Sequence, residues 1–184
     1  MKRALITGCS ALLFCGTVLA KTIAGVELPN QAIIDNTSIN YQGAGVRTKF
    51  FMKLYVASLY GSGQAEAMLS GQQPAMIQLD ILSGLITSEN MKTTIEEGFQ
   101  QSAGAQFADL KPKIQTLMAA FDGPISEGDR FQIRSFPGQP VELHKNGQPL
   151  TAIEGDAFRE ALLGIWLGSK PVSGRLKSEM LGQI

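Results

Sequence analysis

The chain has 184 residues, of which 44% are hydrophobic and 17% charged, with 16 basic and 16 acidic side chains. This length suits one domain with a sizeable core. Two of the basic residues, Lys2 and Arg3, lie at the very N-terminus, so the rest of the chain has 14 basic against 16 acidic residues. That balance excludes a broadly basic surface for nucleic acid or anionic lipid headgroups. We therefore expect small molecules or proteins as partners and no nucleic acid.

Residues 1–20, "MKRALITGCSALLFCGTVLA", have the pattern of a signal peptide. A basic start is followed by a short apolar run and by small residues that suit cleavage after Ala20. We expect a single domain over 21–184 in the periplasm and no membrane span, because the run is short and polar at its edges. Processing as a lipoprotein is the alternative, because "ITGC", which ends at Cys9, resembles a lipoprotein processing site.

Cysteine and histidine are too scarce to indicate metal or thiol chemistry. Both cysteines, Cys9 and Cys15, lie in the expected signal peptide, which leaves the mature chain without a disulfide, a thiol nucleophile or a thiolate metal site. His144 is the only histidine and stands beside a predicted hairpin turn. We interpret it as a surface residue, because a catalytic base would need to lie deep in a cleft. No glycine-rich phosphate motif follows a strand, so we expect no cofactor and no metal.

The N-terminal part of the expected domain predicts strands. "IAGVEL" at 23–28 indicates a short first strand and "TSINYQGAGVR" at 37–47 a second. Gly43 and Gly45 inside the second strand suggest a bulge or the close approach of another backbone.

A long strand follows within "GAGVRTKFFMKLYVASLYG" at 43–61. After Lys49 this segment is amphipathic at first and then apolar on both faces, so the strand runs from the rim of a sheet into a core. A short helix is expected around 65–70, and the alternation in "AMIQLDIL" at 75–82 predicts another strand.

Two helices are predicted next. Thr87 or Ser88 caps the first, and Asp109 caps the second, "DLKPKIQTLMAAF", with Pro112 in its first turn. The apolar residues that recur at helical spacing are Met91, Ile95 and Phe99 in the first helix and Leu110, Ile114, Leu117, Met118 and Phe121 in the second.

The C-terminal part predicts a hairpin and two more helices. Asn146-Gly147 marks a tight turn between "VELHK" and "QPLTAI", after the strand "RFQIRSF". A helix ends at Gly168, and a last one begins at Ser173. Their core-facing residues are Phe158, Ala161, Leu162, Ile165 and Trp166, then Leu176 and Met180. This order of elements predicts an α+β fold, with an antiparallel sheet covered by helices on one side.

Arg47 is the most informative charged residue, because it stands at the rim of the long strand where the sequence becomes apolar. Two interpretations are open. Arg47 is either a solvated cation at a strand end, or a guanidinium held over an apolar cavity where it binds an anion.

Three segments, taken together, carry a family resemblance: "GAGVRTKFFMKLYVASLY", the Asn146-Gly147 hairpin and "AFREALLGIWLGSKPVSGRLKSEML". They resemble the chalcone isomerase-like family, in its exported bacterial branch, over nearly all of 21–184. The resemblance implies an open-faced sandwich, in which a curved antiparallel sheet packs against a layer of helices with a ligand cleft between them. The family contains plant chalcone–flavanone isomerases, plastid fatty-acid-binding proteins and non-catalytic members.

The resemblance also implies site residues. In the enzymes an arginine before this strand holds the substrate oxyanion, and in the fatty-acid binders it holds the carboxylate; Arg47 corresponds to it, with a shorter spacer than in the plant enzymes. A threonine that polarises the ketone corresponds to Tyr55, and a tyrosine with the same task corresponds to Met91. Methionine cannot donate a hydrogen bond. We expect Arg47, Tyr55 and Met91 to contact the ligand and isomerase activity to be lost.

Three functions follow as hypotheses. The first is a binding protein for a small apolar acid such as a fatty acid, with the carboxylate bound by Arg47 and Tyr55 as a possible second donor. The second is an isomerase (intramolecular lyase) of the chalcone type, acting on a phenolic ligand with altered catalytic groups. The third is an envelope protein that binds no ligand and fills its cleft with its own side chains. The sequence gives no indication of the oligomeric state.

Overall fold

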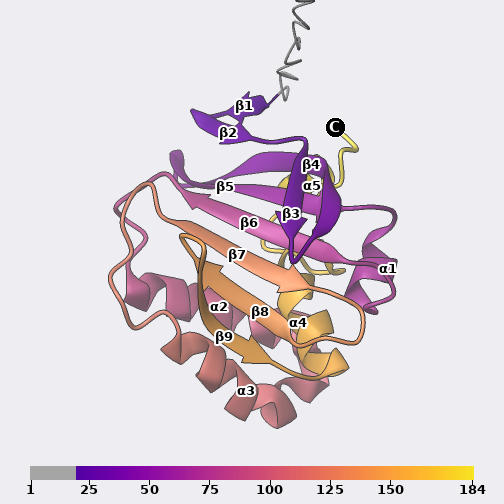
Figure 1. Cartoon of the computed structure of the whole chain (residues 1–184). Coiled ribbons are helices and arrows are strands. Elements are labelled where there is room, and N and C mark those ends of the chain that lie inside the picture. The colour runs from indigo at the N-terminus through magenta and orange to yellow at the C-terminus, as the bar shows by residue number, and fades with distance from the viewer. Residues whose placement is uncertain (1–19) are drawn as a thin grey trace, which may run out of the picture.

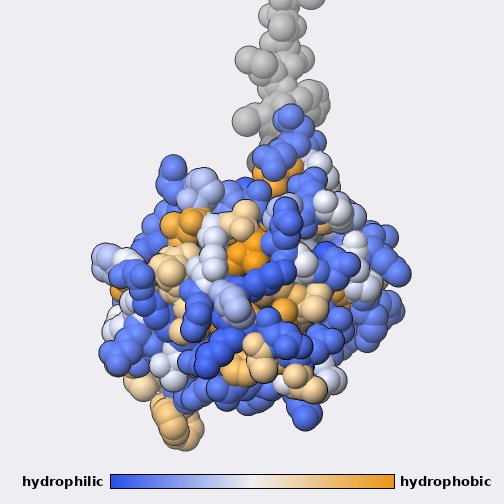
Figure 2. Space-filling view, turned by 90° about the horizontal axis from the view of Figure 1, so that it is seen from below, coloured by the Kyte–Doolittle hydropathy of each residue, from blue (hydrophilic) through white to orange (hydrophobic). Residues whose placement is uncertain are grey.

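A curled antiparallel sheet of seven strands, with helices packed on one of its faces, makes up most of the protein in the computed structural model (Figure 1). The structure describes residues 20–184, so the expected signal peptide lies outside the described residues apart from Ala20. Within the described part, no helix is long and apolar enough to cross a membrane. On the face shown in Figure 2, hydrophobic residues gather near the centre and hydrophilic residues surround them.

The strands of the large sheet lie side by side in chain order, and every neighbouring pair is antiparallel. They are β3 (Gln31–Ile34), β4 (Thr37–Lys49), β5 (Met52–Gly61), β6 (Ala75–Ile81), β7 (Arg130–Ser135), β8 (Val141–Lys145) and β9 (Gln148–Ile153). A separate hairpin of β1 (Lys21–Ile23) and β2 (Val26–Leu28) precedes them. The helices are α1 (Ala65–Leu69), α2 (Ser88–Ala103), the short 3₁₀ helix η1 (Gly104–Gln106), α3 (Phe107–Ala119), α4 (Asp156–Leu167) and α5 (Gly174–Met180).

Two strand predictions are wrong because turns interrupt them. "IAGVEL" is not one strand: Ala24 and Gly25, with φ of 49° and 85°, form a turn between β1 and β2. The long strand predicted after Lys49 begins only at Met52, because Phe50 and Phe51 form the turn between β4 and β5 with φ of 50° and 65°. Bulky residues rarely take this backbone conformation, so the sequence carries no turn signal there. The strand β3 was not predicted.

The predicted cap of α2 is confirmed at Thr87, and Ser173, where the last helix was predicted to begin, is the cap of α5. The Thr87 side chain accepts a hydrogen bond from the Asn90 backbone N–H, and Ser173 does the same for Leu176. The helix α3 begins at Phe107, two residues before the predicted Asp109 cap, because η1 leads directly into it. Pro112 therefore lies inside the helix and not in its first turn.

The main core lies between the sheet and the helices α2, α3 and α4, which share one side of it (Figure 1). The rings of Phe99 on α2 and Phe158 on α4 stack with centroids 5.5 Å apart, and both side chains are fully buried. On the opposite face, where β3 and β4 curl over the sheet, a second and smaller apolar cluster forms from Ile34, Ile39, Tyr60 and Met76.

The C-terminal helix α5 packs directly on the backbone of β4 at Gly43 and Gly45. A Cβ atom on Gly43 would lie 2.3 Å from the backbone oxygen of Glu179. The register of β4 against β5 also shifts between Tyr41 and Gly43. Both features that the glycines suggested, a bulge and a close approach of backbone, are thus present.

Candidate functional site

Arg47 and Tyr55 are direct cross-strand neighbours, on β4 and β5 respectively. Residues opposite each other in an antiparallel pair share a face of the sheet. Arg47 is half-buried, and its Nη1 donates a hydrogen bond of 3.0 Å to the Thr48 carbonyl oxygen. A second irregularity in the strand register, between Arg47 and Thr48, lies at this end of the hairpin. The guanidinium is therefore at the rim, next to a residue of the core.

The Tyr55 hydroxyl accepts a hydrogen bond from the helical layer. Tyr55 is buried, and the indole Nε1–H of Trp166 on α4 points to its oxygen at 3.3 Å. Burial raises the pKa of Tyr55, while the hydrogen bond from Trp166 and the positive charge of Arg47 act in the opposite direction. The hydroxyl is neutral at physiological pH, so its own proton is available to an acceptor.

Met91 is buried in the first turn of α2 and belongs to the same apolar core cluster as Tyr55. Its thioether is flexible and polarizable, which suits an adaptable apolar wall. The structure thus brings Arg47 and Tyr55 together with Trp166, and it adds Met91 as part of the surrounding core.

Buried apolar side chains of the main core pack together between the sheet and the helices. Two open hollows lie elsewhere, and neither is lined by Arg47, Tyr55 or Met91. One, of about 470 Å³, lies between the β3–β4 hairpin and Lys21. The other, of about 480 Å³, lies between β4 and α5. A ligand that enters the sheet–helix layer must therefore displace core side chains.

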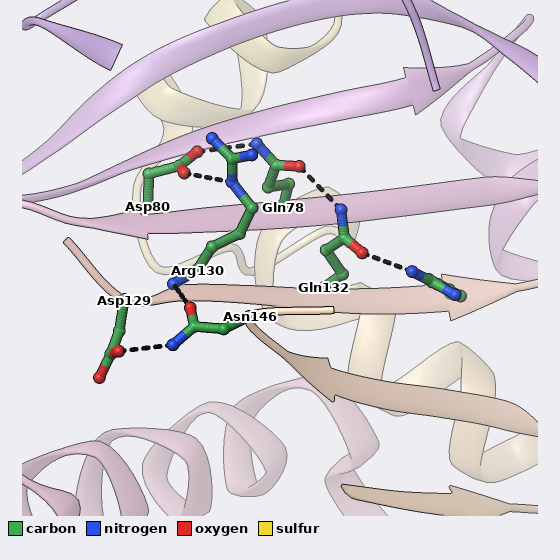
Figure 3. Close-up of polar contacts among 7 residues, drawn as sticks. Gln78, Asp80, Asp129, Arg130, Gln132 and Asn146 are labelled. Carbon is green, nitrogen blue, oxygen red and sulfur yellow. Dashed lines mark hydrogen bonds and ion pairs between the residues drawn. The ribbon is translucent and has the colours of Figure 1, made fainter. Parts of the chain in front are cut away.

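A row of hydrogen-bonded polar side chains crosses the opposite face of the sheet (Figure 3). Asp80 accepts hydrogen bonds from Arg130 Nε at 2.6 Å and from Gln78 Nε2 at 2.9 Å. Gln132 Nε2 donates to Gln78 Oε1 at 3.0 Å, and Arg134 Nη2 donates to Gln132 Oε1 at 2.7 Å. The row links β6 to β7 and satisfies the buried carboxylate of Asp80, so its role is structural.

His144 belongs to this polar face, and its prediction as a surface residue is wrong. Its side chain is buried, and Nε2 lies 2.8 Å from a carboxylate oxygen of Glu142. It lies directly opposite Gln132 in the register of β7 and β8. The hairpin sequence alone does not reveal this burial.

The Asn146-Gly147 turn is confirmed and is tied to the preceding loop. The Asn146 side chain accepts a hydrogen bond from the Arg130 backbone N–H and donates one to Asp129, both at 2.8 Å (Figure 3). Burial pushes the pKa of Asp129 upward, but hydrogen bonds from Lys145, Asn146 and the Ser126 backbone outweigh this and hold the pKa below its ordinary value.

Comparison with known proteins identifies the family. The sequence profile described as chalcone isomerase-like matches residues 20–182. The chain belongs to the chalcone isomerase-like family. A crystal structure of a fatty-acid-binding protein from Arabidopsis thaliana has the same fold, with a TM-score of 0.73 and 14% sequence identity, over 89% of this chain and 95% of that chain. No curated protein sequence matches. The predicted family and the open-faced α+β sandwich are confirmed.

In this chalcone isomerase-like protein, sequence reasoning assigned Trp166 to the core and missed its polar contact. A signal was present, because Trp166 is the only tryptophan and a buried indole N–H usually finds an acceptor. The arrangement offers an anion the guanidinium of Arg47 and the hydroxyl proton of Tyr55, with Trp166 fixing the position of that hydroxyl.

Proposed function

We propose that this chalcone isomerase-like protein binds a small apolar carboxylic acid, such as a fatty acid. The carboxylate is held by Arg47 and Tyr55, and the hydrocarbon chain lies between β5 and the helices α2 and α4. One observation carries the proposal: a half-buried guanidinium is the direct neighbour of a buried neutral hydroxyl where β5 enters the apolar core.

The electrostatics of the rim support an anionic ligand. Within residues 20–184, no carboxylate forms an ion pair with Arg47. The sequence also contains no aspartate or glutamate from 36 to 65. A guanidinium has five N–H donors, and the bond to Thr48 uses one of them. The others suit the two oxygens of a carboxylate.

The shared fold with a plant fatty-acid-binding protein also favours this ligand class. Met91 is the adaptable wall residue that lets the filled core admit a chain. We further propose that the protein acts in the periplasm after removal of residues 1–20, on the strength of the sequence pattern.

The test compares Arg47→Ala and Arg47→Lys with the unchanged protein, using decanoic acid and decanol in calorimetry. A charged hydrogen bond contributes about 1.5–3 kcal/mol. Arg47→Ala should therefore lower the affinity for decanoic acid by about ten- to a hundredfold and leave the affinity for decanol nearly unchanged. Arg47→Lys should rescue only part of the loss, because an ammonium cannot make the two-pronged contact. Lys49→Ala, on the same strand, is the matched control and should leave the acid affinity unchanged.

The same donor pair also suits the second candidate, a chalcone-type isomerase, because Arg47 and the Tyr55 hydroxyl would stabilise an oxyanion. Turnover of a chalcone above its solution rate, lost in Arg47→Ala, would favour that candidate. If Arg47→Ala lowers the affinities for acid and alcohol equally, or lowers neither, Arg47 is a solvated cation at the end of a strand.

A further inference from the structure

The turn between β4 and β5 exposes two aromatic side chains on a strained backbone. Phe50 is 79% exposed, Phe51 is fully exposed at 102%, and Met52 beside them is 45% exposed. The two phenylalanines have φ of 50° and 65°, where bulky residues are genuine outliers and Asn-Gly is the favoured pair. The turn therefore costs stability while its phenyl rings gain little burial, so folding alone does not account for the two phenylalanines.

Basic side chains border this turn. Lys49 and Lys53 are both exposed, and the Lys49 ammonium lies 5.8 Å from the centroid of the Phe50 ring. Among the ion pairs of the described residues, none involves either lysine. The whole sequence has equal numbers of basic and acidic residues, but no acidic residue occurs from 36 to 65. The β4–β5 turn therefore lies in a region with an excess of positive charge.

A further exposed apolar residue lies at the same end of the sheet. Leu85 is 51% exposed in the segment after β6. That segment is joined to the start of β5 by a hydrogen bond of 2.9 Å from the Leu82 N–H to the Leu54 carbonyl oxygen. Figure 1 shows the β4–β5 turn and the segment after β6 on the left of the view.

We propose that residues 49–53, the aromatic tip, insert into the surface of an anionic lipid membrane. The phenyl rings enter the boundary between headgroups and acyl chains, and the two lysines contact lipid phosphates. A protein partner fits less well, because a specific interface needs about 800 Å² on each side, or roughly 20–30 residues, and the aromatic tip has only five residues. The proposal goes beyond acid binding and does not depend on it, although docking would place Arg47 close to a source of fatty acid.

The first experiment locates the inserted residue. Phe51→Trp and, as a matched control, Leu150→Trp on β9 are made in the full chain as the cell processes it. Each is mixed with vesicles of phosphatidylcholine and phosphatidylglycerol in equal parts, with brominated or plain acyl chains. Bromine should quench the added emission of Phe51→Trp and not that of Leu150→Trp, with Trp166 as a constant background in both. Equal quenching in the two variants would overturn the proposal.

The second experiment separates docking from folding. Phe50→Asn with Phe51→Gly installs the favoured turn pair, so this double variant should melt at a higher temperature and yet bind the same vesicles at least about tenfold more weakly. Lys49→Gln and Lys53→Gln should each weaken binding about fivefold on these vesicles and little on phosphatidylcholine alone. The affinity for decanoic acid should be unchanged in all these variants. Failure of the membrane proposal can therefore be distinguished from failure of the acid-binding proposal. Vesicle binding that survives the double variant would overturn the proposal.

Discussion

Two buried tyrosines on β5 occupy opposite faces of the sheet and different surroundings. Tyr55 faces the helices, where Trp166 donates to its hydroxyl. Tyr60 faces the smaller cluster, where its ring packs edge-on against Tyr41 with centroids 5.7 Å apart. Burial is the main reason that the pKa of Tyr60 is raised to about 12. Both hydroxyls are kept neutral, but only Tyr55 has a cation as its cross-strand neighbour.

The pKa of Tyr60 predicts a loss of stability at high pH. An unfolded tyrosine ionises near pH 10, whereas the folded one keeps its proton to about pH 12. The stabilisation from the neutral form is thus fully present below pH 10 and declines above it, by up to about 1.4 kcal/mol per pH unit. In urea titrations from pH 8 to pH 11, Tyr60→Phe should lose unfolding free energy less steeply than the unchanged protein. Parallel profiles would contradict this reading of Tyr60.

Among the elements, β4 is the one that positions the site. Its first four residues pair with β3 and its residues from Tyr41 onward with β5, and register shifts occur after Tyr41 and after Arg47. Between these shifts, α5 lies against the backbone at Gly43 and Gly45, where side chains would collide with it. The helix therefore fixes the strand just before the residue that is proposed to bind the ligand head.

Gly43→Ala tests that packing. The added methyl group would meet backbone atoms of Glu179, Met180 and Gly182 within 3 Å, and backbone cannot give way as a flexible side chain does. We expect a loss of about 1–3 kcal/mol in the free energy of unfolding. Gly84→Ala is the matched control, because nothing lies within 4 Å of its new methyl group. It should be neutral or slightly stabilising in the same chemical denaturation. Equal effects at the two positions would show that α5 does not press on β4.

Local signals in the sequence predicted several caps and turns correctly, although the Asp109 cap and the Asp35-Asn36 turn were not among them. Thr87 and Ser173 cap helices, and Asn146-Gly147 makes a turn, because each acts through its own backbone neighbourhood. The Phe50-Phe51 turn has no such chemistry and is imposed by the pairing of β4 with β5. The resemblance of the 43–61 segment predicted Arg47 and Tyr55 as ligand contacts, and the structure places them opposite each other on β4 and β5.

The sequence indicated that a buried Trp166 indole needs an acceptor, but it did not indicate which residue accepts. Trp166 reaches Tyr55 across 111 positions of the chain, and only the packing of α4 on the sheet brings them together. The burial of His144 is likewise a property of the folded structure that the local hairpin sequence does not specify.

In the molecule as a whole, the two faces of the sheet are stabilised by different kinds of interaction. One carries the polar row from Asp80 to Arg134 and is fixed by hydrogen bonds. The other is packed against helices by apolar contacts, which are non-directional and can rearrange. Because that second interface is filled, a bound hydrocarbon chain must replace core side chains near β5. Uptake of a ligand is therefore expected to wait for an opening between the sheet and the helices.

Substitutions at two buried methionines test this expectation. Met91 lies in the first turn of α2, while Met68 on α1 lies beside Gly61 at the opposite end of β5 from Tyr55. Truncating either to alanine should cost about 2–5 kcal/mol of unfolding free energy, because both leave a cavity. Met91 is near the start of α2, which follows the end of β6 that pairs with Tyr55. We therefore expect Met91→Ala to free volume at the Tyr55 end of the core, so that it alone speeds the uptake of decanoic acid, by about tenfold or more. Stopped-flow emission of Trp166 measures the rate, since the only tryptophan is hydrogen-bonded to Tyr55. If Met68→Ala speeds uptake as much, general loosening of the core governs entry; if neither does, the acid binds outside the sheet–helix layer.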